Sequence, residues 1–345
     1  MKTQSISIPA FTALALLSCS ASAQDAPNPF NVEDRTNEIA PVASVVEKSM
    51  ILNPQRTIVV EGDMIWSAMV TGARKIVFKP GSRLILNKDS PYAPGEFFVV
   101  AETIVVEDPN NPGMITWSKT APATPPDRGE APAGPFGGGN GAGGAAGTEG
   151  SLGYDAPKLT LMVRTIENGG LVIDMNGGDG GAGGIGQKGG QGGPGSQGSP
   201  ARQARENRLG FTAWLPWCES GPGWGGKGGD GGTGGTGGKG GKGGAGGNVS
   251  LVSLPESLPT LFQVVRVKNG GGDGGTGGPG GAGGVSGPGG PEGPLATACS
   301  ASGRNGPAGQ YGAGGTAGVK GDIGPSGQPF VASLSAQQFL RLFGF

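Results

Sequence analysis

Residues 225–246 read GGKGGDGGTGGTGGKGGKGGAG, so that one other residue follows every two glycines. Four further stretches keep glycine at every third position without losing phase: 138–153, 177–198, 272–293 and 303–327. A period of three matches neither an α-helix nor a strand, but it is the period of the polyproline-II helix. That helix has no internal hydrogen bonds, so its backbone must bond to water or to neighbouring chains. The repeat therefore predicts either a packed bundle of such helices or a disordered glycine tract.

The composition favours an ordered protein without a catalytic centre. Of 345 residues, 76 are Gly and 29 are Pro, a proportion found in collagen-like or disordered chains, but a flexible linker needs no strict phase. The formal net charge of −1 gives no electrostatic basis for binding nucleic acid or an anionic membrane. The chain has no histidine, which removes the commonest general base and a usual zinc ligand. We expect no enzyme activity, no metal and no cofactor.

Residues 1–23 have the pattern of a secretion signal. Lys2 supplies the charged start, residues 6–17 the apolar stretch, and Ala21-Ser22-Ala23 the small-residue cleavage site. The apolar stretch is too short for a permanent transmembrane helix, and no later segment qualifies. A lipid anchor at Cys19 is the alternative, because Leu-Leu-Ser-Cys resembles the lipoprotein processing site. The pattern predicts export, to the outer surface of a Gram-negative-type bacterium or to the medium.

Short apolar segments after the signal predict a β-rich base. Residues 24–50 are expected to form a tether, and within 51–118 seven β-branched or aromatic segments are separated by Gly, Pro, Asn and Asp turn signals: 57–60, 64–66, 75–78, 83–86, 97–100, 103–106 and 114–117. Strands of about four residues at this spacing favour a short-stranded β-solenoid over a small sandwich. The base is therefore expected to be one of these two folds, preferably the solenoid.

Strand-like segments return between the glycine stretches, at 158–166, 170–175, 248–254 and 262–268. Each long excursion, the first of them through residues 122–135, is therefore expected to leave the base and come back to it. The fold class predicted is mainly β plus polyproline-II, with about six antiparallel glycine-rich helices over 119–330. A run of 22 residues would extend roughly 68 Å at ~3.1 Å per residue. Ser335 begins a segment of good helix formers, so residues 331–345 are expected to form a C-terminal helix.

The two kinds of glycine repeat predict different places in such a bundle. A Gly-Gly-X helix has two bare edges that neighbours can approach, whereas a Gly-X-X helix has one. The Gly-X-X stretches, 138–153 and 303–327, are therefore expected at the margins of the bundle. In 225–246 the remaining row, which includes Lys227 and Thr233, is expected to face water.

Two cysteines remain after cleavage of the signal, Cys218 and Cys299. An even pair in an exported protein is most often a disulfide. In the out-and-back arrangement both fall in far-end turns, where a disulfide would join them.

The far-end turn around residues 202–224 has an unusual composition for this chain. Arginine and tryptophan dominate binding hot spots, and aromatic faces also stack on sugars and cations. We expect this tip to bind a cell-surface protein or glycan; the alternative is that its aromatic residues form a small local core. The candidate binding residues are Arg202, Arg205, Arg208, Phe211, Trp214, Trp217 and Trp224.

The glycine repeats resemble those of two kinds of protein, on segments such as Gly177-Gly-Asp-Gly-Gly-Ala-Gly-Gly184. Snow-flea-type antifreeze proteins are bundles of polyproline-II (polyglycine-II) helices, and adhesins at the tail-fibre tips of T-even phages carry such helices with surface-binding loops at the far end. The resemblance is one of architecture over roughly the C-terminal two-thirds. It implies a packed bundle with functional loops. The β-rich 51–118 segment departs from the antifreeze pattern, and the signal sequence departs from the phage pattern.

Three functions remain open from the sequence. The leading hypothesis is an exported, non-enzymatic structural or adhesive surface protein, monomeric or part of a surface assembly. An ice-binding protein is the second, with threonines contributing to one flat face: Thr233, Thr236, Thr276 and Thr316. A collagen-like trimer is the third, but only residues 318–327 have a collagen-like sequence.

Overall fold

The computed structural model describes residues 33–34, 57–90, 95–206, 215–300 and 302–342, all within one of the two compact units of the chain, residues 33–345. The expected signal sequence, Cys19 and most of the expected tether lie outside the described residues.

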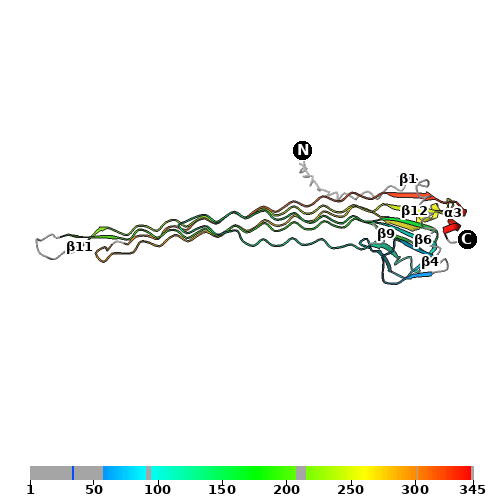
Figure 1. Ribbon diagram of the computed structural model, residues 1–345, viewed down its shortest axis with the longest axis horizontal. Coiled ribbons are helices and arrows are strands. Elements are labelled where there is room, and N and C mark those ends of the chain that lie inside the picture. The colour runs from blue at the N-terminus through cyan, green and yellow to red at the C-terminus, as the bar shows by residue number, and fades with distance from the viewer. Residues whose placement is uncertain (1–32, 35–56, 91–94, 207–214, 301, 343–345) are drawn as a thin grey trace, which may run out of the picture. The chain divides into compact units, whose positions relative to one another are not determined.

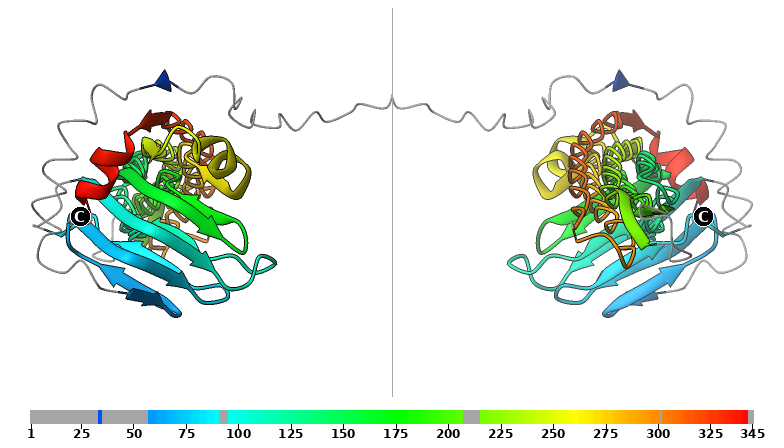
Figure 2. Two further views of the ribbon diagram at one scale, coloured as in Figure 1. Left: turned by 90° about the vertical axis from the view of Figure 1, so that its right-hand side faces the viewer. Right: turned by 90° about the vertical axis from the view of Figure 1, so that its left-hand side faces the viewer.

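The base consists of two sheets in which every paired strand is parallel. In order of position, the first contains β14 (Pro329–Ser333), β12 (Val249–Ser253), β8 (Lys158–Glu167), β6 (Glu96–Val106), β4 (Val70–Phe78) and β2 (Thr57–Val60), with the two-residue β1 (Glu33–Asp34) beside β14. The second contains β13 (Val265–Lys268), β9 (Leu171–Asp174), β7 (Met114–Trp117), β5 (Arg83–Leu86) and β3 (Asp63–Trp66). From β2 to β9, consecutive strands alternate between the two sheets, as Figure 2 shows from the end of the sheets.

Apolar side chains fill the space between the two sheets. Equivalent positions of neighbouring strands lie in register, as in Ile76, Ile104 and Ile166 of β4, β6 and β8, so like side chains stack along the sheet. Both sheets contribute fully buried side chains to this core, among them Ile76, Phe78, Leu84, Leu86, Ile104, Ile115, Leu161 and Ile173. Side chains alternate in direction along a strand, so about every second residue of β2, β4 and β5 points into this core.

Helices close two parts of the base. α2 (Leu258–Val264) buries Leu261 against the main core. α3 (Ala336–Leu342), red in Figure 2, buries Phe339 and Leu342 in a second cluster with residues of the first sheet's other face. A reciprocal capping box begins α3, because the Gln338 amide donates to Ser335 Oγ at 3.2 Å and the Ser335 amide donates to Gln338 Oε1 at 2.9 Å.

Six extended runs lie side by side between the sheets and β11 (Leu215–Ser220), as Figure 1 shows. We number them run 1 (122–135), run 2 (138–153), run 3 (177–198), run 4 (225–246), run 5 (272–293) and run 6 (303–327). Runs 1, 3 and 5 lead away from the sheets and form the outgoing layer; runs 2, 4 and 6 lead back and form the returning layer. Backbone hydrogen bonds repeat every third residue between neighbouring runs.

The backbone hydrogen bonds show whether two neighbouring runs are parallel or antiparallel. Within a layer the pairing is parallel: Gly180 donates to Asp273 O and Gly183 to Thr276 O, both at 2.8 Å. Between layers it is antiparallel: Gly232 donates to Gly190 O and Gly235 to Gln187 O, also at 2.8 Å. Each interior run therefore bonds to runs of both layers, and backbone rather than side chains holds the bundle together.

In run 4, two of the three residue rows consist only of glycine, because neighbouring backbones approach these rows too closely for a Cβ atom. A Cβ atom on Gly235 of run 4 would overlap the carbonyl oxygen of Ala145, and one on Gly234 would overlap that of Gly281. The third row faces the outside of the bundle and carries the side chains. Runs 2 and 6, which have a single regular glycine row, lie at the two ends of the returning layer, as their repeat predicts.

The predicted fold class is wrong: the protein is mainly β with two all-parallel sheets and one short antiparallel pair. Three strands have 9 to 11 residues, which is too long for the expected short-stranded solenoid. The strands pair in parallel, whereas the strands of the alternative, a small sandwich, are antiparallel. The segments 97–100 and 103–106, expected as separate strands, are one strand, β6. Ala101 and Glu102 between them continue the ladder, with Ala101 in the core and Glu102 outside, held 3.1 Å from Arg74 and 3.6 Å from Arg164.

The runs are also not simply antiparallel. Runs that lie beside one another within a layer are parallel, and only runs of opposite layers are antiparallel. The three-residue repeat specifies which edges of a run lack side chains. These edges are the same whether the neighbouring run is parallel or antiparallel. The relative direction of two runs in one layer depends on hydrogen bonds between segments that lie 80 to 94 residues apart. The three-residue period does not specify which of these segments pair.

Acidic and amide side chains extend the bonding between runs of one layer. Asp179 Oδ1 accepts from the Asp273 amide at 2.9 Å, Asn140 Oδ1 from the Asp230 amide at 2.9 Å, and Asp230 Oδ1 from the Gln310 amide at 2.8 Å. Asp230 also accepts from Lys227 Nζ at 2.9 Å. The Gln310 amide, followed by Lys227, lowers the pKa of Asp230 below its ordinary value.

Acid is expected to remove the contribution of Asp230 to stability. Because its pKa is lower in the folded than in the unfolded chain, its contribution is present above the unfolded value and is lost as pH falls through the folded value. Asp230→Asn, which keeps an acceptor oxygen but not the charge, should be less stable than wild type at pH 7, and the gap should close at low pH. Thermal melts from pH 7 to 2 measure this. Asp322→Asn is the control, since it removes a charge from the same layer but not the bond to Gln310; an equal pH response would contradict the assignment.

Candidate functional site

The turns at the far ends of the runs lie together and form the tip. β10 (Arg202–Glu206) pairs antiparallel with β11, with Gln203 opposite Cys218, and this hairpin joins run 3 to run 4. The turn between runs 5 and 6 lies beside it, where the Ala201 amide donates to Pro294 O at 2.9 Å. The hydrogen-bonded register of the runs thus brings two turns of the chain to one place.

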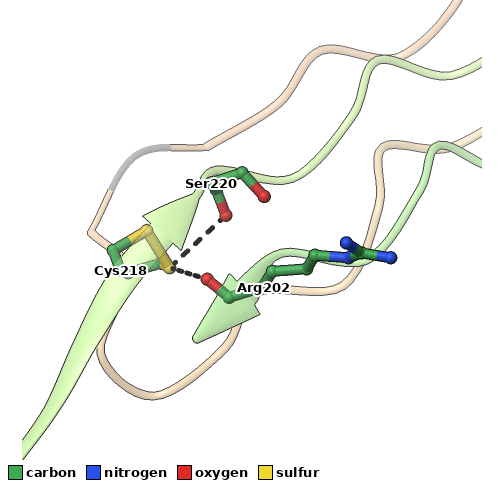
Figure 3. The surroundings of a disulfide bond; sticks show 4 residues. Arg202, Cys218 and Ser220 are labelled. Atoms are coloured by element: carbon green, nitrogen blue, oxygen red, sulfur yellow. Dashed lines mark hydrogen bonds between the residues drawn. A yellow bond between two sulfur atoms is a disulfide. The ribbon is translucent and has the colours of Figure 1, made fainter. Parts of the chain in front are cut away.

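The expected disulfide joins the two turns. Cys218 of β11 and Cys299 of the turn between runs 5 and 6 are bonded, with 4.8 Å between their Cα atoms. The Cys299 sulfur lies 3.7 Å from the carbonyl oxygens of Arg202 and Ser220, as Figure 3 shows; an oxidised sulfur carries no hydrogen, so these are packing contacts. Cys299 is buried. The tip is therefore a single covalently closed unit.

Trp224 and Arg304 form an exposed pair at the tip. The Gly225 amide donates to Arg304 O at 2.8 Å, which fixes the start of run 6 beside the start of run 4. The guanidinium carbon of Arg304 lies 5.6 Å from the centroid of the Trp224 ring, within cation–π range. Trp224 is nevertheless 70% exposed. A large aromatic surface and a cation are thus presented together to solvent.

The other predicted tip residues are placed in part. Arg202 is exposed in β10, and Trp217 of β11 is 41% exposed. Arg205 lies in β10 opposite Pro216, whereas three residues of the prediction lie outside the described residues: Arg208, Phe211 and Trp214. Neither Trp217 nor Trp224 is enclosed in a buried core.

Arg304 is the tip residue that the sequence analysis missed. It lies 80 residues from Trp224, the same separation as that of the bonded pair Asp230 and Gln310. The register between runs 4 and 6 was the signal that would have found it, and that register is set by hydrogen bonds rather than by local sequence.

The four threonines expected on one flat face lie on two. Thr233 and Thr236 of run 4 belong to the returning layer, together with Thr316 of run 6, whose carbonyl accepts from the Gly237 amide at 2.8 Å. Thr276 belongs to run 5 of the outgoing layer. Side chains of the two layers point to opposite sides of the bundle, so the predicted threonine face does not form as one surface.

Other kinds of site find little support in the described part of the chain. No three His, Cys, Asp or Glu residues there lie close enough together to hold a metal ion. Within the same residues, no helix has the length and apolar character needed to cross a membrane. An open hollow of about 350 Å³ lies on the outgoing layer, lined in part by Glu130, Ile185, Lys188 and Ala282.

No protein-family model, curated protein or solved structure matches this chain.

Proposed function

We propose that this chain is an exported, non-enzymatic surface protein whose glycine bundle presents the tip to a cell-surface protein or glycan. The observation that carries the proposal is the exposure of Trp224 beside Arg304 on a tip closed by a disulfide. Tryptophan and arginine contribute most strongly when they anchor a binding partner, and a tryptophan exposed to water without one is unfavourable.

The difference between the runs and the tip indicates that the runs act as a support and the tip as the binding surface. The interior of the runs is bare backbone, so it has few side chains with which to distinguish one partner from another. Run 4 alone has 22 residues and extends roughly 68 Å at ~3.1 Å per residue. A rigid support of this kind separates the tip residues from the sheets, which is what a displayed adhesive surface requires.

The disulfide supports the export part of the proposal. Disulfides persist in oxidising compartments and are rare in the cytosol. Cys218 and Cys299 are 81 residues apart in the sequence, so this bond joins separate excursions rather than a local motif. A bacterial cell envelope or its surroundings would preserve it.

Replacing Trp217 and Trp224 together with alanine is expected to weaken attachment to target cells or to an arrayed glycan by at least about tenfold, since hot-spot truncation costs ≥ 2 kcal/mol. Binding of the labelled protein, with and without the substitutions, measures the effect. Tyr311→Ala is the matched control, because Tyr311 is 77% exposed on run 6 but lies away from the tip. Attachment that survives the double substitution, or that Tyr311→Ala weakens equally, would contradict the proposed role of the tip.

A further inference from the structure

Arg304 carries a positive charge that no carboxylate in the described part of the chain neutralises. Its side chain is exposed, and its guanidinium lies over the Trp224 ring. Neither Glu219 nor Glu292, the described carboxylates of the tip, forms an ion pair with it. By contrast, Lys227, the next cation along run 4, lies 2.9 Å from a carboxylate oxygen. Arg304 therefore presents an unneutralised charge beside an exposed aromatic ring.

This pair leaves both hydrogen-bond donors and ring surface open to a ligand. A guanidinium that stacks on an aromatic ring uses its face, and its N–H groups remain directed outward in the plane of the fork. Trp224 is 70% exposed, so most of its ring surface still contacts water. The tip thus offers planar N–H donors, which match a carboxylate, next to an apolar surface, which matches another flat ring.

The backbone under both side chains is held in place before any ligand arrives. Trp224 comes directly before run 4, and Arg304 is the second residue of run 6. The Gly225 amide donates to Arg304 O at 2.8 Å, and Asn305 Oδ1 accepts from the Glu292 amide at 3.0 Å. The disulfide closes the turn that precedes run 6. Such positioning lowers the entropy that binding would otherwise cost.

We propose that the tip binds an acidic glycan, in which a sugar ring bearing a carboxylate packs on Trp224 while the carboxylate accepts hydrogen bonds from Arg304. An acidic sugar combines an apolar C–H face with a planar anion at a fixed distance from it. A neutral sugar lacks the anion, and an acidic side chain of a protein lacks the ring. The proposal rests on the proposed function of the tip and adds the class of ligand that the tip receives.

The test uses the chain without its expected signal sequence, residues 24–345, in isothermal titration calorimetry. The probes are oligosaccharides of galacturonic acid, glucuronic acid and sialic acid. Each is compared with the same oligosaccharide after its carboxylates have been reduced to alcohols. Wild type is expected to bind at least one acidic form at least about tenfold more tightly than its reduced form, because charge-assisted hydrogen bonds to Arg304 are lost.

Arg304→Gln should remove this preference, so that the acidic and the reduced forms bind equally. The position is exposed, so the variant should melt as wild type does. Lys242→Gln is the matched control, because it removes an exposed positive charge from the same residue row of run 4 as Trp224, but far from the tip. It should keep the preference for the acidic form. Trp224→Ala should weaken binding of both forms together.

Equal binding of the acidic and reduced forms by wild type, or no binding to any of these oligosaccharides, would overturn the proposal. So would a preference that Arg304→Gln keeps or that Lys242→Gln loses. Attachment to target cells distinguishes these failures from a failure of the proposed function. If substitution of Trp217 and Trp224 abolishes attachment but Arg304→Gln does not, the tip remains the binding surface and the acidic glycan is rejected. Attachment lost after protease treatment of the target cells would assign the ligand to a protein.

Discussion

Replacing Gly235 with alanine is expected to destabilise the bundle by about 3–5 kcal/mol, because overpacking a close contact and losing backbone hydrogen bonds add together. The new Cβ would overlap the carbonyl oxygen of Ala145 in the neighbouring run. That overlap cannot be relieved by a rotamer change, since the obstructing atom belongs to the backbone. Moving run 4 away would break the bonds of Gly235 to Gln187 O and of Gly281 to Gly235 O, both 2.8 Å.

Gly314→Ala is the matched control for this substitution. Gly314 lies in run 6 at the margin of the bundle, and the nearest atom to an added Cβ is Gly281 O at 3.7 Å, an ordinary van der Waals distance. This change should be neutral or stabilise by about 0.4–1 kcal/mol, through the reduced freedom of the unfolded chain. Urea unfolding followed by circular dichroism compares the two variants. Similar losses of stability at both positions would contradict a bundle held by backbone approach.

Removing the disulfide with Cys218→Ser and Cys299→Ser is expected to have the second largest effect. For a separation of 81 residues, the chain-entropy relation gives about 4.5 kcal/mol as an upper value, and about 2–4 kcal/mol is typical. The cost falls on the unfolded chain, which gains freedom once runs 3 to 6 are no longer tied at the tip. Unfolding midpoints of wild type, the double variant and wild type in reductant measure it.

Removing the disulfide should also have a local effect at the tip, in addition to its effect on the free energy of unfolding. The ends of runs 5 and 6 near Cys299 would lose their covalent tie to β11, so protease cleavage should begin at the tip while the sheets stay protected. The two sheets, whose core includes Phe78 and Leu86, should retain their near-ultraviolet signal under these conditions. A double variant that resists urea and protease as wild type does would show that the backbone bonds alone hold the tip.

Local patterns predicted much of the bundle. The number of glycine rows in each stretch predicted which runs lie at the margins, because a bare edge is needed only where another backbone approaches. The positions of Cys218 and Cys299 predicted their bond, since both follow from the same out-and-back path. These inferences succeeded because each depends on the three-residue period and on chain order, both of which are written in the sequence.

The local sequence patterns did not predict which distant segments pair with one another. Ala101 and Glu102 separate two apolar segments in the sequence, yet they continue a single strand because β4 and β8 supply partners on both sides. Thr276 was grouped with threonines that lie on the opposite side of the bundle. Arg304 was overlooked although it completes the pair with Trp224. In each case the missing information was a register between segments far apart in the chain.

The sequence by itself determined that glycine recurs with period three, how many edges of each run are bare, and where apolar strands interrupt the runs. Tertiary structure alone decided that both sheets are parallel and that outgoing and returning runs separate into two layers. The physical reason is that steric requirements are local, since a missing Cβ is visible residue by residue. Direction and register, by contrast, come from backbone hydrogen bonds, whose donors and acceptors are the same in every glycine.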